Sequence, residues 1–287
     1  MKSSIIHIMH DNARLNRNIS FFYKKHFFHR DDRHLMRGSS LIRGEQIAVY
    51  LGAKRNPTSG YENDVCIFVK PHFNHYAGLP KNCYVDLLDS KYFIDKLLNR
   101  PDIKLIVSSL ESFHFLKKIL AKNNIVFIPQ HHCNFERDRR AKIDMRVAGY
   151  IGSPSNFNCS IDEVLRRCKQ LGISFIHNFH YKNRSQVCAF YKQIDIQLDW
   201  RSKSTASNPL KIVNACSFGI PTIAYPKPFY EEMDGYYLKA ENFDDMFKTL
   251  GDMKNSPYVY DNYAEIGLLK AEEYHIEKIA DLYRKLY

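Results

Sequence analysis

The stretch from Asn208 to Tyr225 contains the residues best suited to bind an anionic group. Asn208 can cap a helix, and Pro209 fits the first turn of that helix, where its missing N–H costs nothing. Lys211 lies in the same turn and shares a helix face with Asn214, three residues later. A helix N-terminus beside a lysine is suited to bind phosphate. The alternative is an ordinary helix–strand unit of an open sheet.

Two further groups of polar residues follow apolar runs that we predict to be strands. After the run at 4–9, Asp11 could act as a general base and His10 could contact a substrate, although Asp11 could equally cap the next helix. After the run at 125–128, His132 could contact a phosphate or another substrate group. The His-His-Cys triplet around His132 has adjacent side chains that point apart, whereas zinc needs spaced ligands, so we expect no metal site.

Short apolar segments alternate with helical patterns along the chain, which indicates α/β domains with parallel, doubly wound sheets. The predicted strands are 4–9, 46–52, 65–69, 84–88, 103–107, 125–128, 147–151, 173–179, 196–200, 220–224 and 236–238. The predicted helices include 16–26, 91–98, 111–121, 160–171, 185–193, 243–250 and a last helical region from 261, with an apolar stripe of Leu269, Ile276, Ile279, Tyr283 and Leu286.

The polar segment 130–142 separates two successive α/β halves of similar size. We therefore expect two Rossmann-like parallel-sheet domains that face a cleft, at 1–142 and 143–270, followed by a C-terminal helix at 271–287. Ligands of open α/β sheets bind beyond the carboxyl ends of the strands, and domain interfaces favour such sites. The candidate residues above therefore belong to the walls of this cleft.

The composition is typical of a soluble α/β protein, and the net charge favours an anionic partner. The 287 residues are 45% hydrophobic, and we find no apolar run of the roughly 18 residues that a membrane span requires. The seven cysteines are scattered without a CxxC pair, which favours reduced thiols and a cytoplasmic location. The net charge of +11 favours nucleic acid, an anionic membrane surface or phosphorylated substrates.

Much of this charge lies in the segment 14–43, where aromatic residues alternate with lysines and arginines. Such a segment could bind nucleic acid or dock on an anionic membrane surface. The alternative is that its aromatic residues are core and its cations a solvated face. No recognised nucleic-acid motif accompanies the charge, so a nucleic-acid-binding protein is the second hypothesis and peripheral membrane attachment a milder one.

The second half resembles a known family. The residues that carry the resemblance are the segments 147–152 (Val-Ala-Gly-Tyr-Ile-Gly), 191–196 (Tyr-Lys-Gln-Ile-Asp-Ile) and 208–225, together with the closing helix from Glu273. This part, from about residue 145 to 287, resembles the donor-binding domain of GT-B glycosyltransferases of the retaining, glycogen-synthase and capsule-synthesis type. The first half matches only in its general α/β pattern.

The resemblance implies transfer of a sugar from a nucleotide donor to a saccharide or lipid-linked acceptor in surface polysaccharide synthesis. It implies no bound metal and no cofactor other than the nucleotide-sugar substrate. The Gly152-Ser153 loop, Lys211 and the helix start at Asn208 would hold the donor phosphate. Glycine allows close backbone approach, and lysine and helix N–H groups stabilise charge on a departing phosphate.

The chain departs from the family pattern at Asn214, where many relatives have a glutamate that binds the ribose hydroxyls. An asparagine can still donate and accept hydrogen bonds there. The departure leaves the donor open between a UDP or GDP sugar and a CMP-activated sugar acid such as Kdo. Retention or inversion at the anomeric carbon is also open.

Five more positions take roles from the resemblance. His180 or Tyr181 could stack on the nucleotide base, Thr205 and Ser207 could donate hydroxyl groups to the phosphate, and Glu231 could contact the sugar hydroxyls. His180 could instead belong to an exposed loop, and Glu231 could be a first-turn charge of a helix.

Overall fold

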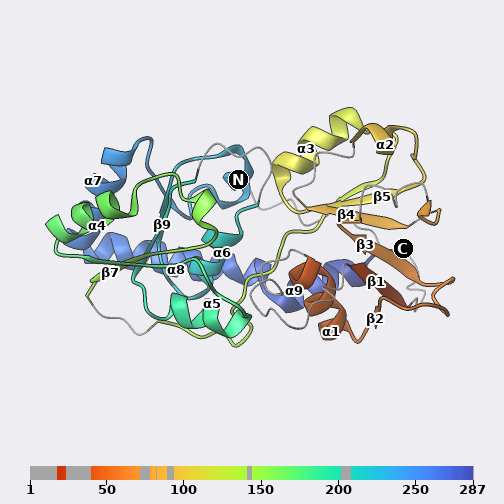
Figure 1. Ribbon diagram of the computed structural model, residues 1–287, viewed down its shortest axis with the longest axis horizontal. Coiled ribbons are helices and arrows are strands. Elements are labelled where there is room, and N and C mark those ends of the chain that lie inside the picture. Colours follow the sequence, from red (N-terminus) through yellow and green to blue (C-terminus); the bar gives the residue numbers. More distant parts are fainter. Residues whose placement is uncertain are drawn as a thin grey trace.

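The computed structural model describes residues 18–23, 40–71, 78–81, 83–88, 94–140, 144–201 and 208–286. These residues form two parallel β-sheets that lie side by side, each with its own helices (Figure 1). The first sheet has the strand order β2-β1-β3-β4-β5-β6 and the second the order β11-β10-β9-β7-β8. The prediction of two Rossmann-like parallel-sheet halves is confirmed. The strand predicted at 4–9 lies outside the described residues.

The central strands of the first sheet are almost continuously apolar and buried, as expected for parallel strands with both faces covered. Its strands are β1 (Ile19–Tyr23), β2 (Lys54–Arg55), β3 (Val65–Val69), β4 (Tyr84–Leu88), β5 (Lys104–Val107) and β6 (Ile125–Phe127). Its helices are the π-helix η1 (Leu41–Gln46), α1 (Ile47–Leu51), α2 (Ile94–Leu98) and α3 (Leu110–Ile119).

Two predictions for the first half are wrong. The helix predicted at 16–26 contains strand β1, which pairs with both β2 and β3. The strand predicted at 46–52 is helix α1, which ends at Gly52 in the left-handed conformation. In both places the apolar run is only about five residues long, too short for periodicity to separate helix from strand.

The second half follows the predicted order of elements closely. Its strands are β7 (Val147–Ile151), β8 (Ser174–Asn178), β9 (Ile196–Asp199), β10 (Thr222–Ala224) and β11 (Leu238–Lys239). Its helices are η3 (Pro154–Asn156), α4 (Ile161–Gln170), α5 (Arg184–Tyr191), α6 (Leu210–Ser217), η4 (Pro228–Met233), α7 (Phe243–Asn255) and α8 (Pro257–Ala271). The turn η5 (Glu272–Tyr274) and helix α9 (Ile276–Arg284) complete the chain.

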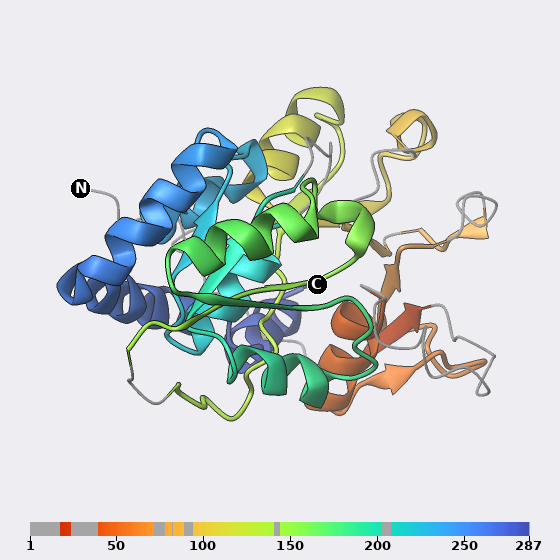
Figure 2. The same ribbon diagram turned by 60° about the vertical axis from the view of Figure 1, so that its left-hand side comes forward.

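Helix α9 leaves the second half and packs on the first. Figures 1 and 2 show it beside α1, and the Tyr283 ring lies 5.5 Å from that of Phe21 in β1. Ile276, Ile279 and Tyr283 are buried in the core of the first half, as the predicted apolar stripe requires. Leu269 does not belong to this stripe, because it lies on α8 and is 75% exposed.

Several residues in the described part of the segment 14–43 belong to the core of the first half. Phe21 is fully buried, and the ring of Phe22 stacks on that of Phe68 at 4.5 Å. The buried Arg43 forms an ion pair with Asp86 at 2.6 Å. These groups are therefore not available to a membrane or a nucleic acid; residues 14–17 and 24–39 lie outside the described residues. Among the described residues, no helix is long and apolar enough to cross a membrane.

The polar segment between the sheets is bound to the second half. Arg140 forms an ion pair with the buried Asp195, and its backbone N–H donates to the carbonyl of Phe218. Glu136 accepts from the Arg184 guanidinium of α5 at 2.7 Å. These contacts hold the segment in place between the two sheets.

Candidate functional site

A cavity of about 230 Å³ lies between the two halves. The first half contributes residues of η1, the connecting segment contributes Gln130 to Cys133, and the second half contributes α5, the start of α6 and the end of β7. The lining residues are Ile42, Gln46, Gln130, His131, His132, Cys133, Ile151, Tyr181, Arg184, Val187, Tyr191, Arg201, Asn208, Leu210, Lys211 and Asn214.

The start of α6 lies in the cavity wall, and Asn208 holds it there. The side-chain oxygen Oδ1 of Asn208 accepts from the Leu210 N–H at 3.1 Å, which satisfies one free donor of the helix start. The Asn208 amide donates to Gln130 Oε1 at 2.9 Å and so ties the helix start to the connecting segment. Pro209 is the N-cap residue, so α6 begins at Leu210, one residue later than predicted.

The side chain of Lys211 points into a cluster of buried polar groups. Its ammonium lies 3.4 Å from the carboxylate of Asp199, at the carboxyl end of β9, and 3.8 Å from the centre of the Tyr150 ring. Arg201 contacts the same carboxylate through Nε at 3.1 Å. The Tyr230 hydroxyl of η4 donates to the other carboxylate oxygen.

The charges of this cluster depend on its burial. Burial alone would raise the pKa of Asp199, but Arg201 and Lys211 hold it down to about 2. Burial lowers the pKa of Lys211 to about 7, although Asp199 opposes the shift. The cluster therefore carries a permanent Arg201 cation and a Lys211 amine that gains or loses its proton near neutral pH.

The Gly152-Ser153 loop after β7 lies against this lysine. A Cβ atom at Gly152 would come within 2.6 Å of Lys211 Nζ. The glycine therefore leaves the space that the ammonium occupies. Ser153 donates to or accepts from Ser155 at 2.8 Å and is not among the residues that line the cavity.

Asn214 lies one turn after Lys211 on the same wall. Its side-chain oxygen accepts from the Cys133 N–H at 2.8 Å, and the residue is 8% exposed. The position predicted to contact a ribose therefore also joins α6 to the connecting segment.

His132 lines the cavity but is a poor proton acceptor. Burial lowers its pKa to about 3, and the Asn134 N–H donates to its Nδ1 at 3.2 Å. With Nδ1 as an acceptor, a neutral imidazole carries its proton on Nε2, and the ring also forms a hydrogen bond with the backbone of Ala271. His131 is committed to the backbone, with its ring nitrogens 3.0 Å from the carbonyls of His132 and Ile42.

The structure brings together part of the predicted site. Asn208, Lys211, Asn214 and His132 line one cavity, and Gly152 contacts Lys211. His180 is exposed and does not line the cavity, whereas its neighbour Tyr181 does. His10, Asp11, Thr205 and Ser207 lie outside the described residues.

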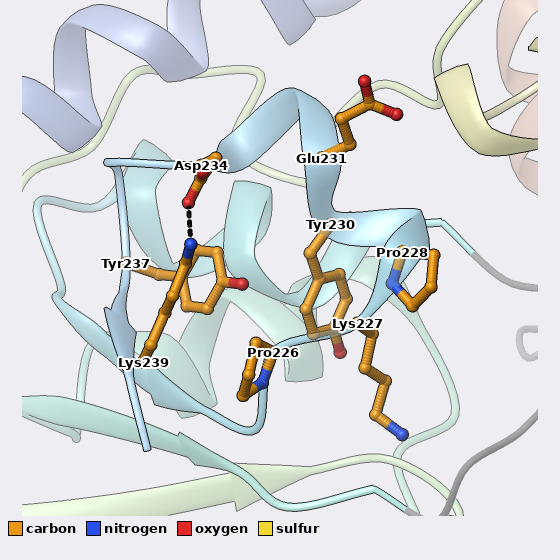
Figure 3. Close-up of a pocket in the computed structure, with 8 residues that line it drawn as sticks. All are labelled: Pro226, Lys227, Pro228, Tyr230, Glu231, Asp234, Tyr237 and Lys239. Carbon is orange, nitrogen blue, oxygen red and sulfur yellow. Dashed lines mark ion pairs between the residues drawn. The ribbon is translucent and has the colours of Figure 1, made fainter. Parts of the chain in front are cut away.

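Glu231 lies in a separate, shallow pocket around η4. Figure 3 shows its carboxylate pointing away from the rings of Tyr230 and Tyr237, while Lys239 pairs with Asp234 at 2.5 Å. This pocket has a volume of about 410 Å³. Its carboxylates, Glu231 and Asp234, are exposed, so the cavity with the buried charge cluster is the stronger candidate site.

The sequence analysis did not single out Asp199, Arg201, Tyr150 or Tyr230. Asp199 and Arg201 flank the carboxyl end of a correctly predicted strand, so the rule that ligands bind beyond such ends could have found them. No local pattern indicates Tyr150 or Tyr230, because their partners lie in other elements.

The fold matches two solved structures over nearly the whole length of the chain. A glycosyltransferase from Rickettsia africae superposes with a TM-score of 0.64 at 10% identity, covering 93% of this chain and 97% of that one. WaaG, a glycosyltransferase involved in lipopolysaccharide biosynthesis, superposes with a TM-score of 0.56 at 11% identity, over 92% of this chain and 99% of WaaG. The chain has the GT-B glycosyltransferase fold.

Other comparisons cover a smaller share of this chain and of the matched protein. The pneumococcal O-GlcNAc transferase GtfA, solved with UDP and GlcNAc, has a TM-score of 0.51 at 15% identity, over 78% of this chain and 52% of GtfA. An uncharacterized glycosyltransferase of Haemophilus influenzae is 26% identical over 110 residues, which is 36% of this chain and 28% of that protein. No family model matches the chain.

Proposed function

We propose that this GT-B protein is a glycosyltransferase that moves a sugar from a nucleotide-activated donor to a saccharide or lipid-linked acceptor. The observation that carries the proposal is the pair of cations on the wall of a cavity between the two halves, Lys211 in the first turn of α6 and Arg201 just after β9. A phosphate at this place would meet two positive charges and the positive end of a helix.

The pair of cations suits the chemistry of glycosyl transfer. As the bond between the anomeric carbon and the donor phosphate breaks, negative charge develops on the phosphate oxygens. Groups that are already in place stabilise this charge without reorganisation, and they act more strongly where water is excluded. The acceptor hydroxyl would attack from the first half, across the cavity. The relative GtfA binds UDP, which supports a nucleoside diphosphate as leaving group.

The remaining predicted roles form part of this proposal. The Gly152-Ser153 loop, Asn208, Lys211 and Asn214 would bind the donor, together with His180, Thr205, Ser207 and Glu231. Asp11 would act as general base, with His10 and His132 contacting the substrates. Residues 1–142 would form the acceptor-side domain, 143–270 the donor-binding domain and 271–287 a C-terminal helix.

Asn214 leaves two donor classes in the proposal. Its side-chain oxygen already accepts from Cys133, and its side chain also forms a hydrogen bond with Tyr191, so a ribose hydroxyl would have to share these contacts. A UDP or GDP sugar is the first candidate, and a CMP-activated sugar acid is the alternative. We further propose that the reaction needs no metal and belongs to surface polysaccharide synthesis at the inner face of the membrane, with WaaG as the relative that supports this role.

The test is a thermal-shift screen of the intact protein with UDP, GDP, ADP and CMP. A nucleotide at about 100 times its Kd stabilises the folded state by about 2.7 kcal/mol, a shift of several degrees in Tm. We expect one nucleotide to give such a shift and Lys211→Ala to abolish it. Lys239→Ala, on the same half and paired only with surface Asp234, is the control and should keep the shift. If no nucleotide stabilises the wild-type protein, the proposed donor site is wrong.

A further inference from the structure

The buried carboxylate of Asp199 is the common partner of both cations in the cavity wall. It is fully buried at the end of β9 and does not line the cavity, whereas Arg201 and Lys211 do. Arg201 Nε lies 3.1 Å and Lys211 Nζ 3.4 Å from the same oxygen, Oδ1. Asp199 therefore stands behind the two groups that a ligand would meet first.

The two cations depend on this carboxylate for their charge and their position. Their side chains are only 11% and 14% exposed, so water screens them poorly and they repel each other. A buried lysine without a counter-ion loses its proton, and a buried arginine without a partner costs several kcal/mol in other proteins. One fixed carboxylate between them counters both effects.

A hydrogen bond from a different element fixes the carboxylate itself. The Tyr230 hydroxyl donates to Oδ2, which leaves Oδ1 for the two cations. Tyr230 is 1% exposed, and its ring packs on those of Phe229 and Tyr237. The hydrogen bond from η4 thus fixes the orientation of Asp199, whether or not a ligand occupies the cavity.

We propose that Asp199 is the positioning residue of the donor-phosphate site, which holds the Arg201 guanidinium and the Lys211 ammonium charged and aimed at the cleft. The proposal rests on the proposed function, because it assigns a role within the same site. In the absence of donor, Asp199 is the anion that the two cations share. When the donor phosphate binds, it adds a second anion on the cavity side.

Binding should then draw a fraction of a proton from solvent onto Lys211 at neutral pH. Among the residues that the structure describes, the charged and titratable groups around its amine are Asp199 and Arg201 from the end of β9, Tyr150 from β7 and, through Asp199, Tyr230 from η4. With a pKa of about 7, the free amine is only partly protonated at neutral pH. A phosphate next to it stabilises the ammonium form, so nucleotide affinity should fall as the pH rises from 6 to 9.

The first experiment is calorimetric titration with the nucleotide that stabilises the wild type, at pH values from 6 to 9. For Asp199→Asn we expect the Kd at pH 7 to rise by roughly tenfold, the effect of losing a hydrogen bond to a charged group. The decline of affinity with pH should also begin at a lower pH than in the wild type. Asp234→Asn, the same change at a surface ion pair, should match the wild type in both respects. Equal or tighter binding by Asp199→Asn would show that Asp199 only competes with the nucleotide, which overturns the proposal.

The second experiment needs no nucleotide, so it separates this proposal from the proposed function. Acetic anhydride acylates neutral amines, and mass spectrometry of the intact protein's peptides gives the pH at which Lys211 becomes reactive, with Lys239 as internal reference. We expect a midpoint near pH 7 in the wild type and a midpoint about one pH unit lower in Asp199→Asn. An unchanged midpoint would overturn the proposal. A changed midpoint without any nucleotide binding would overturn the proposed function alone.

If Asp199→Asn does not fold, Tyr230→Phe takes its place. It keeps the carboxylate and removes only the hydrogen bond that orients it. A rise in Kd of about threefold or more supports the proposal, and an unchanged Kd overturns it.

Discussion

At the scale of single residues, the molecule places carboxylates in buried positions with very different surroundings. Asp199 has two cationic neighbours and keeps a low pKa of about 2. Glu232, on η4, is half-buried, and burial raises its pKa to about 8 although Lys270 opposes the shift. Its Oε2 accepts from the Leu110 N–H at the start of α3 at 3.0 Å. One helical turn thus carries both Tyr230, which binds Asp199, and a carboxyl group that contacts the other half of the molecule.

Glu232→Gln should make the protein relatively more stable at alkaline pH. The folded-state pKa of Glu232 lies above the ordinary value of 4.5, so the folded state binds the extra proton between these values. Its contribution to stability is complete below about pH 4.5 and is lost as the pH rises through about 8. We expect the variant to gain a few degrees in Tm over the wild type at pH 9 and little at pH 5.

Thermal unfolding at both pH values, with the exposed neighbour Glu231→Gln as control, measures this effect. A difference between Glu232→Gln and wild type that does not change with pH would show that the carboxylate is charged in the folded state throughout.

At the scale of elements, the site depends on how close one loop and one helix come to each other. The loop after β7 passes within contact distance of the first turn of α6, and the residue that allows this is Gly152. Its φ of +154° and the space taken by Lys211 both disfavour a side chain there. The approach of loop to helix therefore decides where the Lys211 ammonium lies.

Gly152→Ala should weaken nucleotide binding while leaving every charge of the site in place. The new Cβ would lie 2.6 Å from Lys211 Nζ and must displace it. We expect a rise in Kd of roughly tenfold, measured by titration calorimetry. Gly235→Ala is a matched control, because Gly235 also has a positive φ, +85°, but a Cβ there meets no atom within 4 Å. Equal effects of the two variants would mean that backbone strain, and not the displaced lysine, is responsible.

At the scale of the whole molecule, the C-terminal helix α9 joins the two halves. It follows the second half in sequence but covers the first sheet, where Ile279 is 1% exposed and packs in the same core as Phe21 and Ile67. The chain thus crosses between the halves twice, once through the segment after β6 and once through η5. The core of the first half therefore includes residues from the last helix of the chain.

Ile279→Ala should destabilise the protein by about 2–5 kcal/mol, the usual cost of removing a buried isoleucine side chain. We expect the loss in the unfolding of the first half, measured by urea denaturation with hydrogen exchange of the β3 and β4 amides. Leu269→Ala, at an apolar residue of α8 that is 75% exposed, is the control and should change stability little. An unchanged protection of β3 and β4 in Ile279→Ala would contradict the structural role of α9.

Much of this architecture could be predicted from local patterns. Apolar runs such as Val65–Val69 and Val147–Ile151 are buried on both faces of a parallel sheet, and their boundaries are those predicted. The failures at 16–26 and 46–52 are short runs with flanking charges, where neighbouring elements decide the conformation. β1 is a strand because it lies between β2 and β3, and α1 is a helix that packs against α9.

The sequence by itself determined the alternation of strands and helices, the two halves and the helix start at Asn208 and Lys211, because these depend on periodicity and capping within a few residues. Only the tertiary structure decided what surrounds Lys211. Asp199, Arg201, Tyr150 and Tyr230 are brought to it from three other elements, and no spacing along the chain encodes that contact. The tertiary structure also decided the charge of Lys211, because the pKa of a lysine depends on its burial and on the ions packed around it.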